Sequence, residues 1–223
     1  NKGLAVIEQK DIYLDKPNTY QVFKNNEDAV PSVLRTVTKS IDITVDSHIL
    51  YGDDKLIAPW AYEAVYAARG EGIMVGYNNR LTPKETLTRE QLITMLMKMT
   101  DYTIDNYDTE FSDVVPGSWY YDYVSTGEYN EVVEGVSDKL FGTGDLITRA
   151  EFAKMITLVF GLAPKDDLVD YTDLGGLDEA TQLAIDAVSD ADLFTGFDGE
   201  YMPNDYVTRE MAAVVMMRIS QME

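Results

Sequence analysis

The sequence contains no cysteine and a single histidine among its 223 residues. The lack of cysteine excludes disulfides, thiol catalysis and thiolate metal sites together. One imidazole cannot build a multi-histidine metal centre either. We therefore predict neither a metal site nor a cofactor. His48 lies beside a β-like run and fits a structural or solvent-exposed position.

Basic residues are also scarce, with 18 lysines and arginines against 39 acidic residues and a net charge of −21. Nucleic acid as a partner is excluded, because its phosphates need a basic face. Anionic membrane surfaces are disfavoured for the same reason. The acidic surface favours solubility, and calcium binding at an extracellular surface is the sharper alternative.

No apolar run reaches the roughly 18 residues that a membrane helix needs, so no membrane insertion is expected. The first residues lack a charged-then-apolar signal segment. The chain is therefore expected to be either cytoplasmic or a processed or excised piece of a secreted protein. With 45% hydrophobic residues it can bury a substantial core.

A threonine-arginine pair recurs with a 60-residue period, from 88 to 148 and from 148 to 208. An aromatic-x-Asp element recurs with the same period, and its aspartates are Asp53, Asp113 and Asp173. A fixed period of this size indicates tandem structural repeats. We predict repeats at 51–107, 108–167 and 168–223, preceded at 1–50 by a β-rich extension or the end of a preceding domain.

Each repeat has the pattern of two helices. The first is expected at about 59–70, 118–129 and 177–190. A glycine then follows, which fits a positive φ or a close backbone approach; these glycines are Gly76, Gly135 and Gly196. The second helix is expected to begin at the threonine. Thr88 with Gln91 and Thr148 with Glu151 have capping-box spacing, whereas Thr208 keeps only the cap.

The second helices carry apolar residues at i, i+3, i+4 and i+7, which is typical of an amphipathic helix. The methionines in these stripes are interpreted as core residues. The expected fold is mainly α: a pseudo-threefold prism of three two-helix repeats around a central three-helix core. An open solenoid is the alternative. Within 1–50 we expect strands near 4–7, 12–14 and 40–46 and a short helix at 29–38, with no legible function.

The three repeated arginines are candidate binding residues. A cation in the first helical turn faces the positive end of the helix dipole, at a cost of about 0.3–1 kcal/mol. Three of only seven arginines occupy this position, at 89, 149 and 209, which suggests that the guanidinium has a partner. The partner could be an internal aspartate at 53, 113 or 173. It could also be a carboxylate-bearing or hydroxyl-rich ligand.

Trp60 and Trp119 begin the first helices of repeats 1 and 2, whereas repeat 3 has Glu179-Ala180 there. A tryptophan face can support a sugar ring, and its N–H can donate to a hydroxyl. The alternative is that both tryptophans are core or wedge residues between repeats. A third equivalent site is not expected.

Together these residues resemble the S-layer homology domain family over about 51–223. The carriers are the aromatic-x-Asp elements, the Trp-led helix, the glycine turn and the Thr-Arg helix start, complete as Ile147-Thr148-Arg149-Ala150-Glu151. The resemblance implies an extracellular module on the bacterial cell surface that anchors a larger protein or enzyme to a cell-wall polysaccharide or peptidoglycan-linked polymer. The implied ligand is a secondary wall polysaccharide, usually pyruvylated, held in grooves between repeats.

The resemblance also implies roles for individual residues. Arg89, Arg149 and Arg209 would contact the ketal carboxylate, and Trp60 and Trp119 would line the sugar. Gly76, Tyr77 and Gly135 fall at groove positions, with Val136 and Phe197 in place of the tyrosine. The aspartates and the capping threonines are expected to be structural. Arg89→Ala and Arg149→Ala are expected to weaken binding while the fold persists.

Two other classes of protein compete with a binding module. One histidine gives no convincing Ser/His/Asp set and no phosphate loop is present, so we do not expect an enzyme, although a carboxylate-pair glycosidase remains an alternative. A self-assembly or calcium-dependent module is the other. The acidic loops at 166–167 and 198–200 lack EF-hand spacing.

Overall fold

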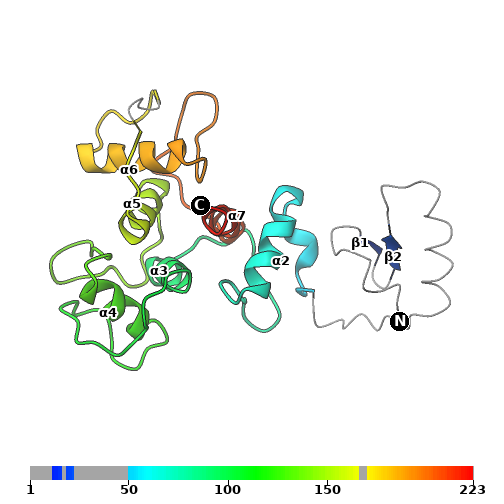
Figure 1. Ribbon diagram of the computed structural model, residues 1–223, viewed down its shortest axis with the longest axis horizontal. Helices are drawn as coiled ribbons and strands as arrows, with labels where there is room; N and C mark the ends of the chain where they lie inside the picture. The colour runs from blue at the N-terminus through cyan, green and yellow to red at the C-terminus, as the bar shows by residue number, and fades with distance from the viewer. Residues whose placement is uncertain (1–11, 17–18, 23–49, 166–169, 223) are drawn as a thin grey trace. The chain divides into compact units, whose positions relative to one another are not determined.

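The computed structural model describes residues 12–16, 19–22, 50–165 and 170–222, and the chain divides after Leu50 into two units (Figure 1). In the first unit β1 (Ile12–Lys16) pairs antiparallel with β2 (Thr19–Val22), with an irregularity between Leu14 and Lys16. The other elements expected before residue 50, together with His48, lie outside the described residues.

The second unit is helical, and the prediction of a mainly α fold is confirmed. Each repeat contributes two α-helices: α2 (Tyr62–Gly70) and α3 (Arg89–Met97), α4 (Tyr121–Tyr129) and α5 (Arg149–Phe160), α6 (Glu179–Asp190) and α7 (Arg209–Ile219). Two short 3₁₀ turns, η3 (Asp54–Leu56) and η4 (Pro59–Ala61), precede α2. The first helices begin two or three residues later than expected. In repeat 1 Pro59 starts a 3₁₀ turn instead, because proline fits the first position of a helical turn.

The second helices begin where the sequence predicts. Thr88, Thr148 and Thr208 are the N-caps of α3, α5 and α7, each with extended backbone. The capping box is complete at Thr148 with Glu151. At Thr88 one half is formed: the amide donates to Gln91 Oε1 at 3.4 Å, and the threonine Oγ1 has no hydrogen-bond partner in the described part of the chain. Thr208 accepts a hydrogen bond from the Met211 amide at 3.4 Å without a reciprocal partner, as its methionine dictates.

Three residues just before these helices exchange backbone hydrogen bonds in a closed cycle. The Leu87 amide donates to the Val207 carbonyl, the Val207 amide to the Ile147 carbonyl and the Ile147 amide to the Leu87 carbonyl, at 2.9, 3.1 and 2.9 Å. All three side chains are fully buried. Repeat 3 therefore contacts repeat 1 directly, which an open solenoid of three repeats would not allow.

The helices follow the same cyclic order. Figure 1 shows α3, α5 and α7 at the centre of the second unit, with α2, α4 and α6 around them. Each outer helix packs on an inner helix of another repeat: α4 on α3, α6 on α5 and α2 on α7. The apolar stripes of the inner helices are buried as expected, including Met95, Met155 and Met216. Every boundary between repeats therefore has the same construction.

Candidate functional site

Each repeat's aspartate binds backbone amides about 28 residues later in its own repeat. Asp53 accepts from the amides of Leu81 and Thr82 at 2.9 and 2.7 Å. Asp113 accepts from three amides, those of residues 141, 142 and 143, at 2.8, 2.8 and 2.7 Å. Asp173 accepts from residues 201 and 202 at 2.9 and 2.7 Å. The aspartates thus hold the loop that leads to the second helix.

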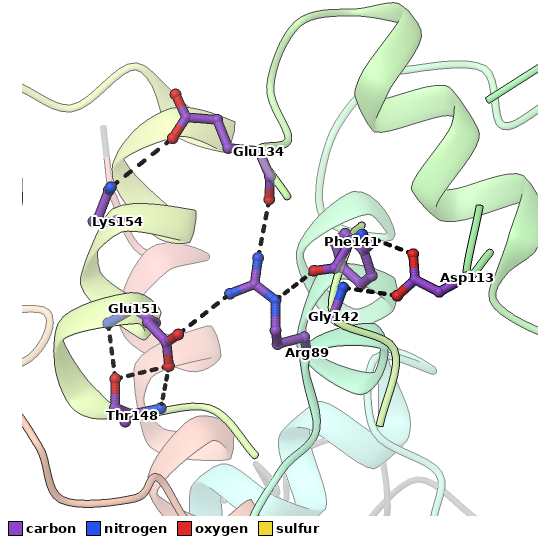
Figure 2. A network of polar contacts seen from close by, with 8 residues as sticks. All are labelled: Arg89, Asp113, Glu134, Phe141, Gly142, Thr148, Glu151 and Lys154. Atoms are coloured by element: carbon purple, nitrogen blue, oxygen red, sulfur yellow. Dashed lines mark hydrogen bonds and ion pairs between the residues drawn. The ribbon is translucent and has the colours of Figure 1, made fainter. Parts of the chain in front are cut away.

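Each arginine donates a hydrogen bond to a backbone carbonyl in the following repeat of the cycle. The residue that provides this carbonyl is the one whose amide donates to the aspartate of that following repeat. Figure 2 shows this for Arg89, whose Nε donates to the Phe141 carbonyl at 2.8 Å and whose Nη2 donates to the Glu134 carbonyl at 2.9 Å. Arg149 donates to the carbonyls of residues 201 and 195 at 2.7 and 2.9 Å. Arg209 closes the cycle by donating to the Leu81 carbonyl at 2.6 Å.

For two of the three arginines, the outer end of the guanidinium contacts the third helical residue of that same following repeat. Arg89 Nη1 lies 3.7 Å from a carboxylate oxygen of Glu151 (Figure 2), and Arg209 Nη1 donates to Gln91 Oε1 at 3.5 Å. At the equivalent position for Arg149 the residue is Met211, which has no acceptor. The Arg149 guanidinium lies over the rings of Phe194 and Tyr201, at 4.0 and 4.7 Å from their centroids. Backbone carbonyls, not the repeated aspartates, are therefore the hydrogen-bond partners that all three arginines share.

The three arginines differ in exposure. Arg89 and Arg149 are 5% and 6% exposed, whereas Arg209 is only partly buried. Burial lowers the pKa of each of the three guanidinium groups, and neighbouring acidic or tyrosine side chains act in the opposite direction. All three remain cations at neutral pH, because the guanidinium titrates far above it. Arg209 is the one most available to a molecule from solvent.

The glycine turns require a residue without a side chain. Gly76 has φ +70°, and a Cβ there would lie 2.3 Å from the carbonyl oxygen of Arg80. At Gly135 the steric clash alone excludes a side chain, because a Cβ would lie 2.2 Å from the Leu140 carbonyl oxygen. In repeat 1 the turn presents Tyr77 to solvent with 81% of its surface exposed.

A groove of about 1000 Å³ is lined by residues from all three repeats. Repeat 2 supplies Trp119 and Tyr123, and repeat 3 supplies Arg209. The rest comes from repeat 1: the turn around Gly76 and Tyr77, the exposed Arg80, the acidic Glu85 and the α3 face with Gln91, Thr94 and Lys98. We call it the Trp119 groove. It combines exposed aromatic rings with three cations and one carboxylate.

Both tryptophans are more than half exposed, at 58% for Trp60 and 59% for Trp119, which argues against core or wedge positions. Only Trp119 borders the Trp119 groove. Trp60 lines a separate hollow of about 470 Å³ beside Pro59, Tyr62 and Glu63. The two residues therefore face different surroundings despite equivalent sequence positions.

From the sequence, Arg89 and Arg149 are favoured over Arg209 as ligand contacts, because their repeats contain a tryptophan and the repeat of Arg209 does not. The cycle instead brings Arg209 to the groove of Trp119. Thr94 and Lys98 also border the groove. Their spacing of three and seven residues after Gln91 on one helical face was the sequence signal for them.

The aspartate contacts give the fold a defined acid sensitivity. Burial alone would raise the pKa of Asp53 and Asp113, but the donating backbone amides outweigh it and hold each pKa below its ordinary 3.8. The folded state then binds fewer protons than the unfolded chain in this range. The stability that these carboxylates contribute is complete above about pH 4 and is lost as the pH falls below it.

We therefore expect the thermal unfolding midpoint, followed by circular dichroism, to fall steeply between pH 4 and pH 2. The Asp113→Asn variant should start from a lower midpoint and fall less over the same range, because it has one such carboxylate fewer. A wild-type midpoint that stays flat to pH 2 would contradict this assignment.

Within the described ranges, no cluster of three or more acidic, histidine or cysteine side chains could hold a metal ion. The expected acidic loop at 166–167 lies outside those ranges. No helix among the described residues is long and apolar enough to cross a bilayer.

Comparison with known proteins finds similarity to one protein family and to several surface proteins. The model of the S-layer homology domain matches residues 50–93 and 110–153. The chain is 26% identical over 192 residues to a surface-layer 125 kDa protein of Lysinibacillus sphaericus, covering 84% of this chain and 16% of that protein. It is 25% identical over 167 residues to a surface layer protein of Brevibacillus choshinensis, covering 71% and 14%.

An endoglucanase of a Bacillus species, strain KSM-635, is 33% identical over 109 residues, which cover 48% of this chain and 11% of that protein. The chain thus spans about a sixth or less of the length of these three relatives. Repeat 3 lies beyond the two matched segments, but its aspartate, arginine and threonine make the same kinds of contact as those of repeats 1 and 2.

Proposed function

Because this chain belongs to the S-layer homology domain family, we propose that it anchors a larger surface protein by holding a pyruvylated secondary wall polysaccharide in the Trp119 groove. The family and its surface-layer relatives imply cell-wall anchoring and a location at the bacterial cell surface. The identity of the polymer and its place in the groove are the parts that we propose.

The observation that carries the proposal is the composition of the groove. It gathers Arg80, Lys98 and Arg209 against the single carboxylate of Glu85, in a chain with twice as many acidic as basic residues. At physiological ionic strength charges are screened over about 8 Å, so this local excess of cations outweighs the distant acidic surface. An anionic group therefore has a reason to bind here.

Each element of the groove suits one part of an acidic sugar. The exposed ring of Trp119 offers an apolar face for the C–H side of a pyranose, and its indole N–H can donate to a hydroxyl. Arg209 uses Nε and Nη1 within the protein, and Nη2 has no hydrogen-bond partner among the described residues. That nitrogen can donate to the ketal carboxylate in a charge-assisted hydrogen bond. The close turn at Gly76 keeps the wall of the groove free of side-chain bulk.

The proposal is tested with wall polysaccharide purified from the host bacterium, titrated calorimetrically before and after removal of its pyruvyl groups. We expect saturable binding before removal and at least tenfold weaker binding afterwards, because the carboxylate for Arg209 is gone. Equal affinity for both preparations would reject the anionic group as the determinant. No binding of either would reject the groove as a polysaccharide site.

We further propose that the chain has no hydrolytic activity of its own. The endoglucanase relative shares only a short part of its length with this chain, so its named activity does not carry over. Incubation with wall polysaccharide should release no reducing sugar above a boiled control. The alternative to a polysaccharide-binding anchor is a calcium-dependent oligomerisation module. A calorimetric titration with calcium chloride tests it, because that module would bind calcium and the anchor proposed here would not need to.

A further inference from the structure

From Arg209, which contacts Gln91 near the start of α3, the Trp119 groove extends for about two helical turns towards the C-terminal end of that helix. Gln91, which accepts from Arg209, and Lys98 are seven residues apart, and both line the groove. At 1.5 Å per residue this places them about 10 Å apart along the helix axis. A single sugar ring that contacts Arg209 would not also reach Lys98.

Thr94, which lies between them, has an unusual hydroxyl. The residue is 6% exposed and lines the groove, yet its Oγ1 has no hydrogen-bond partner in the described part of the chain. A buried helical threonine normally donates to the carbonyl four residues earlier. Thr157 in α5 does so, with its Oγ1 3.1 Å from the Ala153 carbonyl. The unmet polar group in the groove is one that a ligand hydroxyl can satisfy.

Lys98 has donors to spare. Its Nζ donates to the Gly72 carbonyl at 3.0 Å, and an ammonium group has three N–H donors. The equivalent residue of repeat 3 is Arg218, which likewise donates to carbonyls of its own repeat, those of Asp192 and Leu193. Arg218 does not border the Trp119 groove. The two residues share a structural contact and differ in their access to the groove.

We infer, resting on the proposed function, that the Trp119 groove binds two consecutive sugar units. The first lies against Trp119 and Arg209, and the second is held by Thr94, Lys98 and the ring of Tyr123. Tyr123 lies in the first turn of α4 and lines the same groove as Trp119, which precedes that helix. The groove thereby selects a ligand by length as well as by charge.

The test uses fragments of one and two sugars prepared from the wall polysaccharide with the pyruvyl ketal intact, titrated calorimetrically. Wild type should bind the two-sugar fragment at least tenfold more tightly than the one-sugar fragment. Lys98→Met keeps the apolar stem and should lose most of this gain, whereas its affinity for the one-sugar fragment should fall much less, by the loss of one groove cation only. Arg218→Met removes the same kind of carbonyl contact and should keep the full gain.

Thr94→Val separates a ligand contact from a purely structural defect, because it places valine where repeat 3 already has Val214. We expect the ligand-free protein to unfold at a higher temperature, since an unpaired buried hydroxyl is removed. We also expect its affinity for the two-sugar fragment to fall several-fold. Unchanged affinity would overturn the role of Thr94.

The remaining outcomes distinguish the second sugar unit from the proposed function itself. Equal affinity of wild type for the two fragments, or an equal loss for both in Lys98→Met, overturns the second unit and leaves the first in place. Failure of wild type to bind either fragment overturns the proposed function.

Discussion

Trp119→Ala should bind wall polysaccharide about 30-fold more weakly than wild type, a loss of about 2 kcal/mol. A loss of this size is expected when a central aromatic side chain that is desolvated by the ligand is truncated to alanine. The variant should keep its stability within about 0.5 kcal/mol, because the side chain is 59% exposed and its loss opens no cavity. Calorimetric titration and thermal unfolding measure the two quantities separately.

Trp60→Ala is the matched control. It removes the same side chain, with 58% exposure, from the equivalent position of repeat 1. Because Trp60 does not border the Trp119 groove, we expect less than a threefold change in affinity. An equal loss in both variants would mean that two grooves contribute, and no loss in Trp119→Ala would remove this residue from the binding site.

Asp113→Ala should lower the free energy of unfolding by about 3 kcal/mol or more. Three backbone amides lose their charged acceptor at once, and each amide left unpaired costs about 1–3 kcal/mol. At about 2–4 °C per kcal/mol, the unfolding midpoint should fall by roughly 10 °C. Urea denaturation followed by circular dichroism gives the free energy directly.

Asp108→Ala makes the same change of charge at an exposed position nearby and should alter stability by less than about 0.5 kcal/mol. If both variants lost similar stability, the cause would be net charge and not the amide contacts. Asp113→Asn should lie between the two, since its amide oxygen can still accept from part of the loop.

The sequence predicts the helices well because their signals are local. A capping threonine, an N3 acceptor and an apolar stripe all act within one or two turns, so α3, α5 and α7 begin at the expected residues. The first helices are less well predicted, because Pro59 and the turn at 118–120 delay their start.

The partners of the arginines were beyond local reasoning. Arg89 binds carbonyls 45 and 52 residues away, and Arg209 binds one 128 residues away. Carbonyls exist at every residue, so no residue type marks them in the sequence. These contacts also change what Arg89→Ala would measure. The loss of two hydrogen bonds to the next repeat should reduce stability, so weaker binding by this variant would not by itself report a ligand contact.

The closed cycle of Leu87, Ile147 and Val207 has a consequence for how the module withstands pulling. In a linear array the end repeats have one neighbour each and can fray while the middle survives. Here each repeat is bonded to both others, so none is an end. Loss of any one repeat breaks two of the three links and exposes the centre. An anchor built in this way should fail all at once, at one threshold, and not by gradual peeling.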